Sequence, residues 1–243
     1  KILVWCYPRK PPGSATIVAE AGRFVPRIPP GGSAVDRRPL LLALALALAL
    51  AAPRPGHAAT LRVPGDFPLI QQAIDAAQPG DTVRVAAGIF SGPGNRGLDT
   101  RGKPLCLLGA GAGETLIDCA GEAGGFSLRG EGEARSLIQG FTVLRAAAPR
   151  GAGLACAGGR LRVERCAFIG GRADWGAGLA ASWEAQVHLQ ACVFAGNRAA
   201  LGGDDLYLVG GSALLRDCRA SAAGILALGG AELRRLDGAP RPQ

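Results

Sequence analysis

Residues 161–168 read Leu-Arg-Val-Glu-Arg-Cys-Ala-Phe, and the same pattern returns twice further along the chain. The second copy, Val-His-Leu-Gln-Ala-Cys-Val-Phe, begins 26 residues later at 187, and the third, Ala-Leu-Leu-Arg-Asp-Cys-Arg-Ala, begins another 26 residues later at 213. A fixed period in this range is typical of a chain that folds as stacked repeats. Apolar residues at alternate positions of each copy predict a short strand with one buried face.

Glycine-rich segments separate these strand-like copies. Three of them align as Gly151-Ala-Gly-Leu-Ala, Gly176-Ala-Gly-Leu-Ala and Gly202-Gly-Asp-Asp-Leu. Each glycine costs a helix about 0.5–1 kcal/mol, so this density disfavours the compact or helical return limb of a leucine-rich repeat, whose period also fits. We therefore predict an all-β fold, a single-stranded parallel β-helix with about 26 residues per coil, and keep the leucine-rich repeat as the alternative.

Residues 60–90 predict a short helix followed by a strand. One helical face would carry the apolar residues Ile70, Ala73, Ile74 and Ala77. Pro79-Gly80 would end this helix, and Val83 and Val85 alternate in what reads as the first strand. We expect the N-terminal helix to cap the coil, because an uncovered terminal coil exposes unpaired strand edges and apolar core.

This opening resembles that of secreted right-handed parallel β-helix proteins of the pectin-lyase-like superfamily. The repeats resemble, more weakly, those of polymorphic outer-membrane proteins and autotransporter passengers, since Phe194-Ala-Gly-Asn197 fits their FxxN repeat. Together the resemblances cover roughly residues 60–230 and imply a right-handed coil. They specify a shape rather than an activity.

Charge divides the chain into two parts. Residues 1–59 hold 8 Lys plus Arg against 2 Asp plus Glu, whereas residues 60–243 hold 19 against 17. Arg37 and Arg38 precede thirteen residues of Leu and Ala alone, at 40–52, and small residues follow. This predicts a signal peptide at 37–59, cleaved after Ala58 or Ala59, and a secreted or cell-surface protein of bacterial-type export. The apolar run falls short of the roughly 20 residues of a membrane span, so none is expected in the mature chain.

The segments before and after the predicted signal peptide complete the expected organisation of the chain. Residues 1–36 show no hydrophobic periodicity, and we expect a leader that is not translated. The β-helix domain is expected at 60–230, and residues 231–243 are expected to form a tail, either with a small end cap or at the end of a truncated sequence.

A net charge of +2 over residues 60–243 gives no basic stripe, so no nucleic-acid partner is expected.

Cys166, Cys192 and Cys218 occupy one column of the repeat, on the same face as the apolar residues. Cysteine at such positions acts as a small apolar residue, which predicts a ladder of buried thiols. One disulfide within the column and a metal site are the alternatives that we weigh against it. No metal and no cofactor is expected.

Aromatic residues are the candidate ligand-binding residues. Trp175, Trp183 and Tyr207 fall near corners or on the second strand of a coil, where an exposed ring could stack on a sugar; the alternative is that they shield a turn or fill the core. His188 points outward in one column with Arg162, which we interpret as an ordinary solvated face. The sequence thus predicts a surface or extracellular structural or binding module, with a polysaccharide or a cell-surface component as partner and no catalysis. It leaves the oligomeric state open.

The superfamily resemblance also implies an alternative function, that of a lyase or hydrolase acting on acidic polysaccharide. A lyase would need Ca²⁺ held by several carboxylates, and the 26-residue register stacks no carboxylate on another. Gly203-Asp204-Asp205 is similar to one motif of the polygalacturonases, whose other motifs are missing. Asp204 and Asp205 are therefore the candidate catalytic residues of this alternative, and turn formation is the simpler interpretation.

Overall fold

The computed structural model describes residues 58–130 and 135–236, and the account below concerns these residues. The expected leader at 1–36, the apolar run of the signal peptide and the end of the tail lie outside them. No helix among the described residues has the length and apolarity needed to cross a bilayer.

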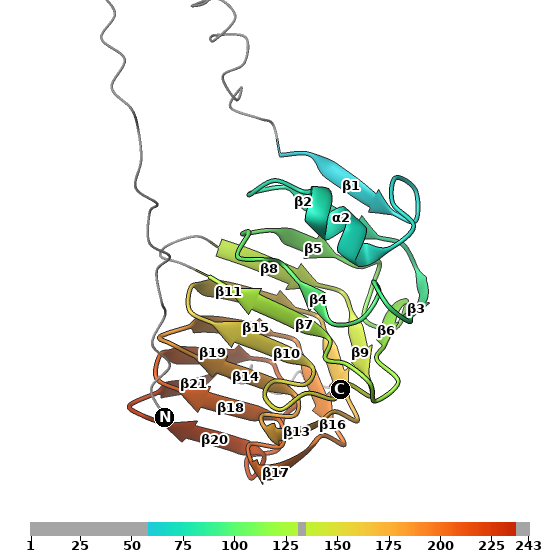
Figure 1. Cartoon of the computed structure of the whole chain (residues 1–243). Helices are drawn as coiled ribbons and strands as arrows, with labels where there is room; N and C mark the ends of the chain where they lie inside the picture. Colours follow the sequence, from blue (N-terminus) through green and yellow to red (C-terminus); the bar gives the residue numbers. More distant parts are fainter. Residues whose placement is uncertain (1–57, 131–134, 237–243) are drawn as a thin grey trace, which may run out of the picture. The chain divides into compact units, whose positions relative to one another are not determined.

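The chain winds into a parallel β-solenoid with three main sheets (Figure 1). The first sheet contains β1 (Thr60–Val63), β2 (Thr82–Val85), β5 (Cys106–Leu108), β8 (Arg135–Gln139), β11 (Arg160–Glu164), β15 (Gln186–Gln190), β19 (Ser212–Arg216) and β21 (Glu232–Leu236). The second contains β3 (Gly88–Ser91), β6 (Thr115–Asp118), β9 (Thr142–Leu144), β12 (Ala167–Ile169) and β16 (Val193–Ala195). The third contains β4 (Leu98–Asp99), β7 (Phe126–Arg129), β10 (Leu154–Ala157), β14 (Leu179–Ser182), β18 (Leu206–Val209) and β20 (Ile225–Leu228). A smaller sheet pairs β13 (Arg172–Trp175) with β17 (Arg198–Gly202).

The columns predicted for the strand copies are confirmed by the strand register. The predicted column of glycine segments is wrong by one residue in its third member, because Leu206 and not Asp205 lies beside Leu179. Leu161 lies beside Val187, which lies beside Ala213, so neighbouring coils are offset by 26 residues here. Elsewhere the coil length varies, since Leu107 pairs with Ile138 and Ala213 pairs with Leu233. The return limb consists of strands and glycine turns, with β13 and β14 following β12, so the parallel β-helix is confirmed and the leucine-rich repeat is wrong.

The start of the domain differs from the expectation in one respect. β1 already pairs with β2, so the segment with Val83 and Val85 is the second strand of the first sheet and not the first. A short helix, α2 (Ile70–Ala76), lies between these two strands and buries Ile70, Ala73 and Ile74. Its first free N–H group, that of Ile70, donates to the side-chain oxygen of Asn95 at 3.1 Å. The capping role expected for this helix stays a prediction.

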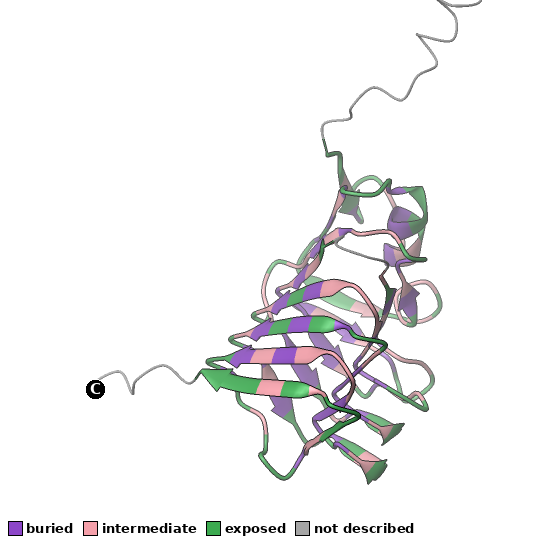
Figure 2. Ribbon diagram, turned by 90° about the vertical axis from the view of Figure 1, so that its left-hand side faces the viewer, coloured by how far each residue is buried: buried purple, intermediate pink, exposed green. Residues whose placement is uncertain are grey.

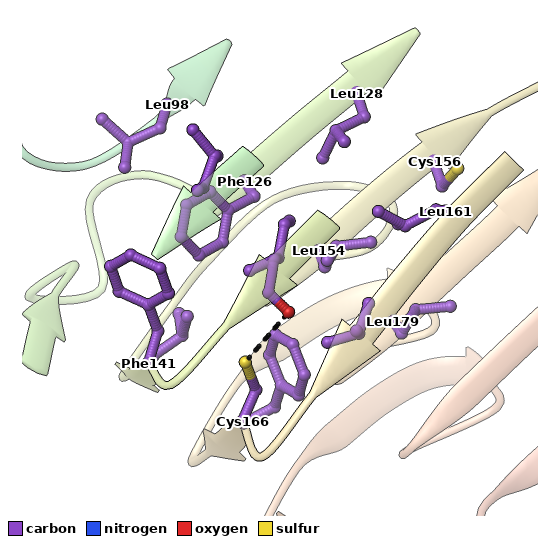
Figure 3. Packing of buried hydrophobic residues seen from close by; sticks show 14 of the residues in the cluster. Leu98, Phe126, Leu128, Phe141, Leu154, Cys156, Leu161, Cys166 and Leu179 are labelled. Carbon is purple, nitrogen blue, oxygen red and sulfur yellow. Dashed lines mark hydrogen bonds between the residues drawn. The ribbon is translucent and has the colours of Figure 1, made fainter. Parts of the chain in front are cut away.

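Apolar side chains from all three sheets meet inside the coil (Figure 3). Phe168 and Phe194 occupy the same position in successive coils, and their rings stack with centroids 5.2 Å apart. Each buried ring contributes about 1.5–3 kcal/mol through removal of apolar surface from water. The rings fit because glycine faces them: a Cβ on Gly153 would lie 2.7 Å from the Phe168 ring, and one on Gly178 would lie 2.6 Å from the Phe194 ring.

The cysteine column is a ladder of buried, free thiols, as predicted. The sulfur atom of each of these cysteines lies 3.3–3.4 Å from the carbonyl oxygen two residues before it. Burial raises the pKa of Cys166 to about 11. The thiol of Cys192 hydrogen-bonds to the sulfur of Cys218, which lowers the pKa of Cys218 to about 7 and raises that of Cys192.

Candidate functional site

The turns that lead from the third sheet to the first form a column of their own. Gly158-Gly159, Gly210-Gly211 and Gly229-Gly230 fill three of these turns, and all six residues have φ between 64° and 74°. Only glycine takes this left-handed conformation without steric cost. The turn between β14 and β15 is one residue longer than the first two of these, and its first two residues, Trp183 and Glu184, take φ of 58° and 59°. Non-glycine side chains are therefore held in the left-handed conformation next to turns that use glycine.

Trp183 points its side chain into solvent rather than into the fold. It is 83% exposed, which makes it the most exposed large hydrophobic residue of the described chain. A non-glycine residue in the left-handed region costs roughly 1–2 kcal/mol. Because the ring is not buried, the turn gains no stability from packing of the tryptophan. Its exposure, rather than a positive φ that Arg165, Ala191 and Asp217 also take, is the reason to look for a function.

A groove lies over the outer face of the first sheet, next to this turn column. Figure 2 turns this face toward the viewer, and its strands alternate buried and solvent-facing residues. The groove has a volume of about 220 Å³ and crosses β8, β11 and β15. Apart from the apolar Leu161, its lining is basic and polar: Arg135, Ser136, Arg160, Arg162, Gln186 and His188.

Two arginines of the groove, Arg160 and Arg162, donate hydrogen bonds to the next coil. The Nε atom of Arg160 donates to the side-chain oxygen of Gln186 at 3.1 Å. Arg162 donates to the side-chain oxygen of Gln190 at 3.2 Å and forms an ion pair with Glu164. The expected column of Arg162 with His188 is confirmed by the register. The interpretation of this column as an ordinary solvated face missed the groove. The sequence feature that could have indicated the groove is the alignment of Arg160 with Arg135 of the preceding coil.

The other two candidate aromatic residues pack on each other. The ring centroids of Trp175 and Tyr207 lie 4.9 Å apart with an interplanar angle of 30°. Trp175 pairs in register with Gly202, and Tyr207 is buried. The structure thus brings Trp175 and Tyr207 together and places Trp183 on a different turn, where its ring is the one left open.

The two adjacent aspartates differ in their surroundings. Asp204 is exposed, and its carboxylate accepts a 2.6 Å hydrogen bond from the backbone N–H of Ala199. Asp205 is buried, and both of its carboxylate oxygens accept hydrogen bonds, one from the Asn197 side chain at 3.1 Å and one from the Ser221 N–H at 2.8 Å. Asn197 also holds the backbone of the coil before it, by accepting from Gly171 and donating to Phe168.

This pattern gives the aspartates turn-forming contacts rather than the free carboxylate pair that hydrolysis requires. Asp205 sits in the glycine column beside Gly178, where a side chain fits because the phenylalanine stack has ended at Ala220. Within residues 58–130 and 135–236, no three His, Cys, Asp or Glu side chains gather as metal ligands would.

Comparison with known proteins yields one structural likeness. No protein family and no curated protein matches the sequence. Among solved structures, the chain is similar to a pectin methylesterase from carrot, at 12% sequence identity and a TM-score of 0.35, over 78% of this chain and 86% of that one.

Proposed function

We propose that this chain is an exported module that binds polysaccharide at the cell surface or outside the cell, without catalysing a reaction. The observation that carries the proposal is the exposed, strained position of Trp183 in a column of glycine turns. The flat face of an indole ring packs well against the C–H groups of a sugar ring, and its N–H edge can stay in contact with water. A solenoid that repeats its strands also offers a long, regular surface to a polymer with a regular repeat.

The surroundings of the aspartates support binding over catalysis. A general base or nucleophile must face the substrate, whereas Asp205 is buried and its carboxylate accepts hydrogen bonds from Asn197 and Ser221. Product release from pectins and alginates, measured with and without calcium, tests the enzymatic alternative. Release that is abolished by Asp204→Ala would overturn the non-catalytic proposal.

Binding is tested with immobilised polysaccharides and the full chain. We expect retention of the protein on at least one glycan and loss of that retention in Trp183→Ala. Ile89→Ala is the matched control, because Ile89 is also a large, 72% exposed side chain but lies on β3, away from the turn column. Equal retention of Trp183→Ala and the unchanged protein would refute the assigned role of the ring, and retention on no glycan would refute the proposed function.

Contacts at the start of the domain support export with cleavage after Ala58. The N–H group of Ala59 donates to the buried carboxylate of Asp81 at 2.8 Å, and the Ala59 carbonyl oxygen accepts from Thr82 at 2.8 Å. Cleavage after Ala58 would turn that N–H into an ammonium group beside Asp81 and strengthen the bond by a full charge. Intact-mass analysis of the exported protein should therefore give a chain that begins at Ala59. A chain that retains residues 40–52 would overturn the proposed export and processing.

A further inference from the structure

Cys192 and Cys218 lie side by side in successive coils, just after β15 and β19. The backbone is paired on both sides of them: the Ala191 N–H donates to the Arg216 carbonyl oxygen at 2.9 Å, and the Arg219 N–H donates to the Cys192 carbonyl oxygen at 2.8 Å. We propose that these two thiols are an oxidisable dithiol site, at which a hydroperoxide converts them into one intramolecular disulfide. The proposed binding function does not depend on this site.

The spacing of the coils suits a disulfide between these residues. Neighbouring parallel strands are about 4.8 Å apart, and a disulfide joins residues whose Cα atoms are roughly 4.4–6.8 Å apart. The two sulfur atoms are already in contact, because the Cys192 thiol hydrogen-bonds to the sulfur of Cys218. Formation of the bond therefore requires rotation of two side chains and no separation of the coils.

The contacts of the third cysteine in the ladder explain why this pair is favoured. The sulfur of Cys166 lies 3.7 Å from the carbonyl oxygen of Ile138 in the coil before it (Figure 3). The sulfur of Cys192 lies 3.4 Å from the equivalent oxygen, that of Val163. Cys218 instead meets the Cys192 thiol of the coil before it. The direct contact between two sulfurs thus favours Cys218 over Cys166 as the partner of Cys192.

Access and ionisation make Cys218 the thiol that meets the oxidant first. Its residue is 7% exposed, against 0% for Cys192 and 1% for Cys166. The thiolate is the nucleophilic form of cysteine. The hydrogen bond from Cys192 lowers the pKa of Cys218 to about 7, although burial and the nearby Asp217 carboxylate act in the opposite direction. A thiolate is therefore available at neutral pH at the more accessible of the two sulfurs.

The reaction has two steps, which together pass two electrons from the thiols to the peroxide. The Cys218 thiolate attacks one peroxide oxygen, so that an S–O bond forms, the O–O bond breaks and hydroxide leaves. The hydroxide takes up the proton that Cys218 released and becomes water. The Cys192 sulfur then attacks the sulfur of the Cys218 sulfenic acid, so that the S–S bond forms and the S–O bond breaks. The departing hydroxyl group leaves with the Cys192 proton as a second water.

Peptide mapping of the full chain tests the pairing. The reduced protein is treated with hydrogen peroxide, denatured, blocked with N-ethylmaleimide and digested with trypsin without reduction. Arg172 lies between Cys166 and Cys192, and Arg198 lies between Cys192 and Cys218, so the three cysteines fall on separate peptides. We expect the peptides of Cys192 and Cys218 to be linked, with a loss of two blocked thiols and two hydrogens.

The unfolded chain is the matched control for the role of the fold. Cys192 is 26 residues from Cys166 and 26 residues from Cys218, so loop closure alone favours neither partner. Oxidation in guanidinium chloride should give the two disulfides in similar yield, whereas the folded protein should give at least about fivefold more of the Cys192–Cys218 bond because only this pair is held in contact.

Two variants separate the steps of the reaction. In Cys192→Ala, Cys218 should stop at the sulfenic acid, which dimedone captures as a stable adduct, and no disulfide should form. Cys166→Ala is the matched control and should form the same disulfide as the unchanged protein. A first disulfide between Cys166 and Cys192 in the folded protein, a disulfide between two chains, or full retention of the three thiols under peroxide would overturn the proposal. The peptide map of the unchanged chain decides it even if a variant does not fold.

Discussion

Replacing Trp183 by glycine should stabilise the fold while it removes ligand binding. The ring is 83% exposed, so its loss removes little buried apolar surface. The backbone at φ 58° is released from a strain of roughly 1–2 kcal/mol. Glycine also makes the unfolded chain more flexible, which lowers the free energy of unfolding by about 0.4–1 kcal/mol. The net expectation is a gain of about 0.5–1 kcal/mol in the free energy of unfolding.

Thermal unfolding followed by circular dichroism measures this gain. For a domain of this size, 1 kcal/mol corresponds to about 2–4 °C in the midpoint, so we expect an increase of about 1–4 °C for Trp183→Gly. Glu184→Gly is the matched control, because its φ of 59° is relieved in the same turn. It should show a similar increase and keep the binding that Trp183→Gly loses. A midpoint lowered by several degrees in Trp183→Gly would show that the ring supports the fold, and the argument from strain would then be refuted.

Two further predictions concern the interior. Gly178→Ala should destabilise the fold by about 1–3 kcal/mol in chemical denaturation, because its new Cβ would lie 2.4 Å from the carbonyl oxygen of Asp205. Gly113→Ala is the control, because a Cβ there would meet nothing within 4 Å, and it should be neutral or slightly stabilising. In the folded protein, iodoacetamide should modify Cys218 before the other thiols of the ladder, and faster as the pH rises through about 7, because the hydrogen bond from Cys192 lowers the pKa of Cys218. Peptide mass spectrometry that finds Cys192 modified first would contradict this order.

The candidate site was predictable in part. The position of Trp183 near a corner follows from the repeat, because the strand copies on either side of it are fixed by their apolar residues. Its exposure did not follow, since Trp175 stands equally near a corner and packs against Tyr207. The difference arises because Tyr207 of the neighbouring coil packs against the Trp175 ring, which is a relation between coils and not between neighbours in the chain.

One irregularity in the strand register shows where the 26-residue period of the sequence fails. The register shifts by one residue between Ala173 and Trp175, so that Leu206 pairs with Leu179 at an offset of 27 rather than 26. The shift places Asp205 in the glycine column and leaves Asp204 in solvent. No local sequence rule distinguishes these two adjacent aspartates, because a bulge takes up its extra residue wherever the packing of both coils allows it.

The alternating apolar residues of the copies at 161, 187 and 213 were enough to predict the solenoid, its columns of apolar residues and its ladder of thiols, because stacked coils bury all of these residues at once. Which outward side chains share a surface depends instead on how the coils stack. Coils of unequal length set how far apart in the sequence two neighbouring residues lie, as with Leu107 and Ile138 or Ala213 and Leu233. The groove over β8, β11 and β15 exists because that stacking brings arginines of separate coils together.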